Sequence, residues 1–375
     1  MKKALCILLA LAMVFVLATA CKNDNEPDSP SSPGGNETSP SGGNNPSTPS
    51  TGTTDDGPGW NPDNIGTHTF IMAHGLPGAG MTGMQYQVFA DKVAELSGGK
   101  MTVDYRPGGT LITDTQTLDS VMAGTVDFVH IKGSFIANVV TDLSPITIAG
   151  YYGGDDWLGF VDDVRPILQD IFADYGINML GSLYEGSSVI ACTSKNITSP
   201  SDVQGLTFRA SGTWLSRTIG VWGGAATVIS LADLADTFNR RAVDGVMTGW
   251  NIIVPFSIYE VTPYLTNTTM AEGWAGLLMN MDRFNKLNAD EQALIIEAGL
   301  YFEEQSFTLG NQFIAEYIET SENSGFNTVV QLTPAQEQEF INLAYSLFPM
   351  IEAEEDLSPK GLEFIRILKE INGIH

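Results

Sequence analysis

Short apolar runs alternate with amphipathic stretches along most of the chain, from about residue 66 onward. The apolar runs are typical of strands, and they lie at 67–73, 101–106, 126–131, 178–183, 187–193 and 276–281. Apolar residues at helical spacing separate them, at 84–96, 114–123, 164–175, 230–241, 334–347 and 359–372. This alternation predicts an α/β protein whose binding site lies at the carboxyl ends of its strands.

The longest predicted element covers residues 289–324, a stretch that holds little but helix-forming residues. Gly299 and Gly310 are its only weak points, since glycine disfavours a helix interior. The sequence therefore predicts one unusually long helix in the last third of the chain.

The first 62 residues have a different pattern. Lys2 and Lys3 precede an apolar run that ends in small residues before Cys21, which predicts a secretory signal peptide at 1–20. Residues 22–62 are dominated by Asn, Ser, Pro, Gly, Thr and Asp, so burial cannot offset the entropy of ordering them. We interpret residues 21–62 as a flexible tether and 63–375 as the folded body.

Composition narrows the possible functions. The chain has 375 residues, of which 43% are hydrophobic, enough for one or two globular cores. Its formal net charge of -26 argues against a nucleic acid as partner, because phosphate binding needs clustered Lys and Arg. Cys6 would leave with the signal peptide and Cys192 stands alone, so no structural disulfide is expected in the body.

The candidate binding chemistry centres on Arg209. Residues 206–209 alternate as a half-buried strand does, and Trp214 belongs to a helical pattern that follows. A guanidinium group matches a carboxylate with two parallel hydrogen bonds, and a helix N-terminus offers free N–H groups. Residues 246–251, which include Trp250, are expected to face the same cleft. The segment predicts a carboxylate-binding site.

The same residues carry a resemblance to a known family. The runs GLTFRAS and LADLADTFNRRAVDG resemble the solute-binding subunit of TRAP transporters, the DctP-type family. HTFIMAHGLPGAG and LLMNMDRFNKLNADEQALIIEAG are similar to other parts of that family, so the resemblance spans about 66–327. It implies a two-lobed periplasmic binding protein fold in which the long helix spans both lobes. The first lobe would hold about 66–187 and 274–310, and the second about 188–273 and 311–375.

A hinge between the lobes is expected at the crossing strand 187–192 and at a turn around Asn267. Matched position by position, Arg209 would be the principal carboxylate-binding residue, and Asp114 and Lys132 would lie in the cleft. Ser188 stands where many relatives carry a second arginine. The residues expected to contact the ligand are Arg209, Lys132, Asp114, Ser188, Trp214, Leu231, Thr248, Trp250 and Asn251.

The resemblance also implies partners and a location. The ligand would be a small organic acid, delivered to the small and large membrane subunits of the transporter without chemical change, so neither a catalytic residue nor a cofactor or metal is expected. Cys21 follows small residues as in a lipobox, which predicts a lipid-anchored protein facing the periplasm or cell exterior. Ala18 departs from the usual leucine of that motif. Ordinary cleavage, with an unmodified Cys21, is the alternative.

The sequence offers weaker support for other functions. Gly78, Gly80 and Gly83 satisfy G-x-G-x-x-G, but the next strand ends in Arg-Pro rather than in the acidic residue of a dinucleotide site. Cys192 lies in an apolar strand without a nearby histidine, which favours a core position over a nucleophile. The histidines are scattered without metal-ligand spacing, and they are His68, His74, His130 and His375. A glycosidase-like carboxylate pair is not favoured by any spacing. The main alternative of another class is an exported adhesin or scaffold that reuses a binding-protein fold.

Overall fold

The computed structural model of the protein describes residues 59–148, 150, 156–270 and 273–374. They belong to one compact unit, Asp56–His375. The expected signal peptide, the Cys21 lipidation site and nearly all of the expected tether lie outside the described residues.

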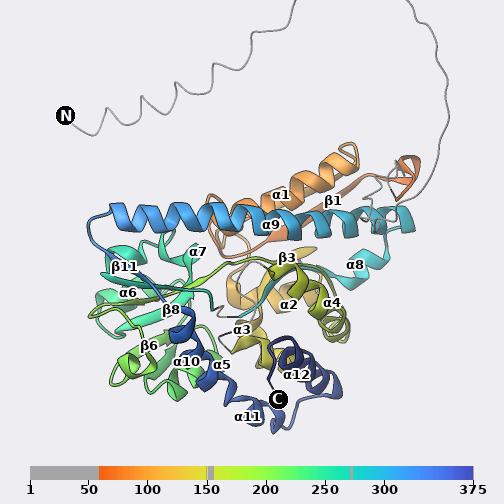
Figure 1. Ribbon diagram of the computed structural model, residues 1–375. Coiled ribbons are helices and arrows are strands. Elements are labelled where there is room, and N and C mark those ends of the chain that lie inside the picture. Colours follow the sequence, from red (N-terminus) through yellow and green to blue (C-terminus); the bar gives the residue numbers. More distant parts are fainter. Residues whose placement is uncertain (1–58, 149, 151–155, 271–272, 375) are drawn as a thin grey trace, which may run out of the picture. The chain divides into compact units, whose positions relative to one another are not determined.

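The first of two sheets has five strands in the order β2-β1-β3-β10-β4. Strand β1 pairs in parallel with β2 and β3, whereas β10 runs antiparallel to β3 and β4. Of these strands, β1 and β3 are labelled in Figure 1. The strands are β1 His68–Ala73, β2 Met101–Arg106, β3 Phe128–Lys132, β4 Ile177–Leu183 and β10 Ala275–Asn280. The sequence therefore predicted every strand of this sheet to within two residues.

Helices cover this sheet because their apolar stripes pack against it. α4 follows the stripe Trp157, Phe160, Val161, Val164 and Leu168, all buried, and it begins well before the expected residue 164. It tolerates Pro166 in its interior. The helical segments on this side are α1 Met81–Leu96, η2 Asp114–Gln116, α2 Thr117–Met122, α3 Gly133–Ile136, η3 Thr141–Thr147 and α4 Trp157–Ala173.

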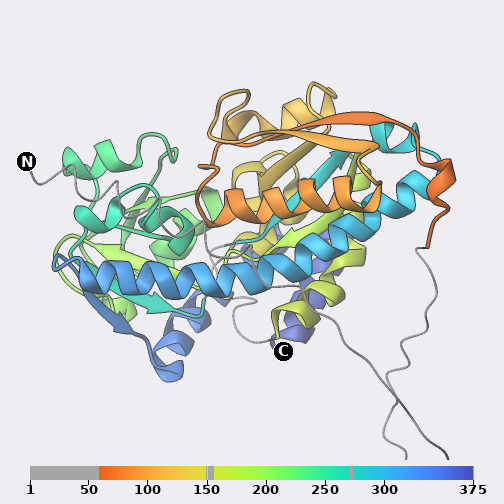
Figure 2. The same ribbon diagram turned by 90° about the horizontal axis from the view of Figure 1, so that it is seen from above.

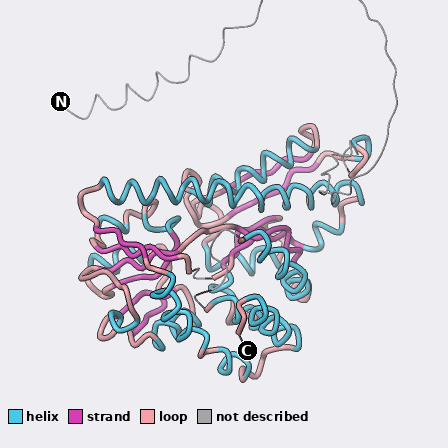
Figure 3. Tube along the Cα trace, in the orientation of Figure 1, coloured by secondary structure: helices cyan, strands magenta, loops and turns pink. Residues whose placement is uncertain are grey.

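The second sheet has six strands in the order β11-β9-β5-β8-β6-β7. Figure 3 shows the strands of the molecule in magenta. They are β5 Ser188–Cys192, β6 Thr207–Ala210, β7 Ala225–Val228, β8 Gly245–Gly249, β9 Tyr264–Thr268 and β11 Thr328–Gln331. Asn267 lies inside β9, paired with Val189 and Gln331, so the expected turn at this position is wrong. A residue held on both sides by neighbouring strands is a poor place for a bend.

The helical segments on this side are η4 Pro200–Val203, α5 Thr213–Val221, α6 Leu234–Asn239, α7 Trp250–Ile253, η5 Ile258–Glu260 and α10 Pro334–Tyr345. α6 is shorter than the expected 230–241. It ends because Arg241 adopts a left-handed backbone with φ of 55°, a conformation that a right-handed helix cannot continue.

In the described part of the chain, the strands pass from one sheet to the other three times, and the C-terminal helices later return the chain to the first-sheet side. It leaves β4 and enters β5 through residues 184–187, and it returns from β9 to β10. The third passage is α9, Ala289–Asn323, preceded by the short α8, Met281–Asn285. α9 packs against α1 and β4 beside the first sheet and against β11 and α7 beside the second (Figures 1 and 2). The predicted long helix is thus confirmed, and it is shared by both sheets.

Gly299 and Gly310 explain how α9 approaches its neighbours so closely. A Cβ added at Gly299 would lie 2.7 Å from the carbonyl oxygen of Leu180, and one at Gly310 would lie 2.5 Å from the ring of Tyr184. The glycines that looked like weak points of the helix are therefore its contact points with strand β4 and the crossing segment.

The C-terminal helices α11, Phe348–Glu352, and α12, Pro359–Ile371, complete the chain. α12 packs against α4 and η3 on the first-sheet side. Ser358 donates to Asp142 and Lys360 donates to Asp174 at 2.7 Å. The expectation that all of 311–375 belongs with the second sheet is therefore wrong for the last helix, whose amphipathic pattern shows that it packs but not on what.

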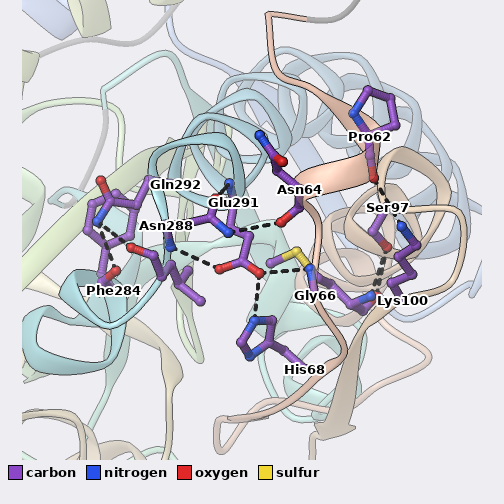
Figure 4. A network of polar contacts seen from close by, with 12 residues as sticks. Pro62, Asn64, Gly66, His68, Ser97, Lys100, Phe284, Asn288, Glu291 and Gln292 are labelled. Carbon is purple, nitrogen blue, oxygen red and sulfur yellow. Dashed lines mark hydrogen bonds and ion pairs between the residues drawn. The ribbon is translucent and has the colours of Figure 1, made fainter.

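The beginning of the described chain is fixed to the beginning of α9. Glu291 accepts hydrogen bonds from the backbone N–H of Gly66 at 2.9 Å and of Asn288 at 2.9 Å, and its carboxylate lies 2.8 Å from Nε2 of His68 (Figure 4). Asn288 in turn donates to the carbonyl of Asn64. Although burial opposes it, these bonds lower the pKa of Glu291. The body's first strand and its longest helix are thus joined at one point.

Candidate ligand-binding site

A cavity with about 340 Å³ of empty space, part of it open to solvent, lies between the two sheets. The first-sheet side contributes Leu76, Asp114, His130, Lys132 and Phe135. The second-sheet side contributes Arg209, Ser211, Leu231, Thr248 and Ile252, and Glu185 comes from the segment that crosses between them. Both sheets therefore supply walls, and a change in their spacing would change the cavity.

Arg209 lies in β6 and is only 1% exposed. Phe208, Arg209 and Ala210 are all buried, so the alternation expected over 206–209 is wrong. β6 lies between β7 and β8, so both of its edges are paired, and α5 packs on one of its faces. Nε of Arg209 donates to the carbonyl of Ile229 at 2.9 Å, which fixes the plane of the guanidinium group.

Asp114 opens the short helix η2 and lines the same cavity. Its carboxylate accepts a hydrogen bond from the backbone N–H of Gly75 at 3.1 Å. A Cβ at Gly75 would lie 2.3 Å from this carboxylate, so only glycine allows the contact. Burial raises the pKa of Asp114, while the Gly75 N–H and the positive charge of Arg209 act in the opposite direction.

Lys132 and Glu185 form an ion pair in the cavity wall, with Nζ 2.5 Å from Oε2. Their side chains are 8% and 12% exposed, so the pair is largely removed from water. The other carboxylate oxygen of Glu185 accepts from Nδ2 of Asn251 at 3.3 Å. Sequence reasoning placed Lys132 in the cleft but missed Glu185, because nothing in the spacing of the two residues indicates that they meet.

His130 also lines the cavity, and sequence reasoning considered it only as a metal ligand. Its Nδ1 lies 3.0 Å from the hydroxyl of Tyr86, which itself donates to the carbonyl of Gly276 at 2.9 Å. The hydroxyl has one proton, so we assign a proton to Nδ1 of His130 from this network. Burial, with a smaller contribution from Lys132, lowers the pKa of His130 to about 3. The imidazole is therefore neutral at physiological pH.

Four of the expected contact residues do not line this cavity. Trp250 is fully buried and donates to Asn267 at 2.7 Å, and Trp214 is buried with the guanidinium of Arg217 4.1 Å from its ring centre. Asn251 donates hydrogen bonds to Thr82 at 3.1 Å and to Glu185, and it lies next to the cavity rather than in its wall. Ser188 lines a neighbouring cavity, which shares Lys132 and Glu185 with the first.

The two sides of the cleft also contact one another. Thr213, at the start of α5, donates to Asn138 at 3.1 Å, and Asn251 donates to Thr82 of α1 at 3.1 Å. A Cβ added at Gly212 would lie 2.3 Å from the carbonyl oxygen of Ser134 in α3. These contacts describe a cleft whose walls are closed on one another.

Residues 72–354 match the family model of the bacterial extracellular solute-binding proteins, family 7, known as DctP. Because the match covers well over half of the chain, the chain belongs to this family of TRAP-type solute receptors. A solute-binding protein from Roseobacter denitrificans is 21% identical over 280 residues, which are 71% of this chain and 84% of that one.

Two solved structures show the same two-lobed α/β fold. The sugar acid binding protein of Advenella mimigardefordensis, in complex with galactonate, has a TM-score of 0.73 at 19% identity and covers 83% of this chain and 100% of its own. The periplasmic ectoine-binding protein of a TRAP transporter from Halomonas elongata has a TM-score of 0.74 at 20% identity, covering 81% and 98%. The fold class predicted from sequence is confirmed.

Two further findings concern only the part of the chain that the structure describes. None of its helices combines the length and the apolar character that crossing a membrane requires. Nor does that part bring three or more His, Cys, Asp or Glu side chains together in a way that could hold a metal ion.

Proposed function

We propose that this chain is the extracytoplasmic receptor of a TRAP-type transporter, which captures a small organic acid through Arg209 and delivers it to the membrane subunits. The observation that carries the proposal is a buried arginine, oriented by its bond to Ile229, in a cavity walled by both sheets. The names of the similar proteins, which specify a sugar acid and ectoine, support a small organic acid as ligand class.

The side chains of the cavity wall explain how the ligand would bind. A ligand carboxylate pairs with the guanidinium fork of Arg209 in a site of low water content, where charge-assisted hydrogen bonds are strong. Thr248 offers a hydroxyl from β8, two residues beyond Val246, the residue that pairs with Arg209. Leu231, Phe135 and Leu76 contribute apolar surface for the rest of the ligand.

Capture requires the cleft to open, because Arg209 is almost fully buried as the walls stand. We expect ligand binding to bring two lobes together without change inside either, as hinge closure does. Small-angle scattering of the exported chain, stripped of ligand and then saturated with the acid that native mass spectrometry finds retained, should show a smaller radius of gyration on saturation. No retained acid and no compaction with any organic acid would instead support a scaffold or adhesin.

The membrane attachment is a separate proposal that rests on the sequence alone. Cys21, following a signal peptide, would carry the lipid that holds the receptor at the membrane. Cys21→Ser should move the protein from the detergent phase to the aqueous phase in phase-partition experiments on cells, because one residue supplies the whole hydrophobic anchor. Partition into detergent by the variant and the parent alike would contradict the anchor.

A further inference from the structure

Among the described residues that line it, the cavity has as many acidic as basic side chains. Arg209 and Lys132 are its cations, and Asp114 and Glu185 are its acids. His130 adds no charge, since burial lowers its pKa to about 3. A site meant for a dianion would need surplus positive charge, because each buried charge without a counter-charge is costly.

The ion pair of Lys132 is one reason why the cavity lacks surplus positive charge. Its ammonium is in contact with Glu185, so its charge is already compensated before any ligand arrives. The position of Ser188, four residues before Cys192 on β5, offers a hydroxyl and no charge. Among the described residues that line the cavity, Arg209 is the second cation, and Asp114 limits the positive charge there.

The carboxylate of Glu185, by contrast, can still accept further hydrogen bonds. A carboxylate has about four lone-pair sites. Lys132 and Asn251 each occupy one in the structure, on different oxygens. Glu185 lines both this cavity and the neighbouring one, so a ligand that extends away from Arg209 meets an acceptor with negative charge.

We infer that the ligand carries a single carboxylate, bound by Arg209, and a hydrogen-bond donor at its other end, an ammonium or another nitrogen donor, bound by Glu185. Glu185 is then the residue that determines specificity, because it both attracts the donor and cancels the charge of Lys132 that would otherwise bind a second carboxylate. The inference rests on the proposed function and adds to it the charge pattern of the ligand.

The test compares acids of equal length that differ only at the far end. The exported chain, freed of bound ligand by partial unfolding and refolding, is titrated in a calorimeter with 4-aminobutanoate, succinate and their five-carbon homologues. We expect the parent to bind the amino acids at least about tenfold more tightly than the dicarboxylates, since like charges brought together in an interface cost several kcal/mol. In Glu185→Gln, which keeps the shape and frees Lys132, the order should reverse.

Two more variants test whether the charge of Glu185 causes the preference for amino acids. Lys132→Met leaves Glu185 without its cation and should increase the preference for the amino acids. Glu316→Gln, at an exposed position of α9, changes the net charge of the protein by the same amount as Glu185→Gln and should leave the order as in the parent. The unfolding midpoint of each variant shows whether it remains folded.

The possible failures are distinguishable. If the parent binds dicarboxylates as tightly as amino acids, or if Glu185→Gln and Glu316→Gln behave alike, the assignment of Glu185 is overturned while the carboxylate receptor stands. If no acid of either series binds, and Arg209→Ala behaves like the parent toward every probe, the proposed function fails as well.

Discussion

Arg209→Ala is expected to reduce the affinity for the acid by about 30-fold to several thousand-fold, because removing one partner of a desolvated charged pair costs about 2 to 5 kcal/mol. Arg209→Lys should also bind clearly more weakly, since lysine keeps the charge but lacks the planar fork. Thr248→Ala removes one neutral hydrogen bond and should cost only about 0.5 to 1.5 kcal/mol. Calorimetry with the same acid measures this ranking.

Arg240→Ala is the matched control, because Arg240 is 67% exposed and pairs with Asp236 on the surface of α6. It should bind like the parent. All variants are to be checked by thermal unfolding, since a loss of binding has meaning only in a folded protein. Parent-like affinity of Arg209→Ala would show that the carboxylate lies elsewhere.

Gly212→Ala should weaken binding by keeping the cleft from closing. The added Cβ would meet the carbonyl oxygen of Ser134 at 2.3 Å, and backbone cannot move aside as a flexible side chain can. The φ of Gly212 is -169°, extended backbone that any residue adopts, so the effect is steric and arises only when the walls meet. Overpacking typically costs about 1 to 3 kcal/mol, which corresponds to roughly 5-fold to 150-fold in affinity.

Gly220→Ala provides the comparison in the same helix α5, where an added Cβ meets nothing within 4 Å. Both variants should have the parent's stability or slightly more without ligand, and only Gly212→Ala should bind more weakly. Scattering should show it remaining expanded at ligand concentrations that compact the parent. Equal binding by both variants would mean that α5 and α3 do not approach during capture.

The elements that the sequence predicted best have a strong local signal, which is apolar–polar alternation in β2 and an almost unbroken run of helix-forming residues in α9. Strand β2 and helix α9 begin where the pattern placed them, and the latter ends within one residue of its expected end. The strands β7 and β11 were missed because they are four-residue strands at the sheet edges in which no residue is buried, so their apolar signal is short. β9 was missed because its buried positions include threonines rather than large apolar residues.

The residues of the candidate site also divide into those that the sequence predicted and those that it did not. The structure brings Arg209, Asp114, Lys132, Leu231 and Thr248 into one cavity, as the resemblance implied. It places the tryptophans in the core, because a large aromatic residue near a binding segment has the same sequence pattern in either location. Glu185 could be found only from the fold, since its contact with Lys132 joins residues 53 positions apart.

The bonds between the start of the body and α9 bear on which sheet would move relative to a fixed attachment. His68 begins β1, and Glu291 holds it to the first turn of α9, so whatever holds the chain on its N-terminal side also holds the first sheet. In that frame of reference the first sheet would stay fixed and the second sheet would move. Arg209 would swing toward Asp114 and Lys132 during capture, and a membrane partner that follows occupancy would do so best by contacting the second lobe.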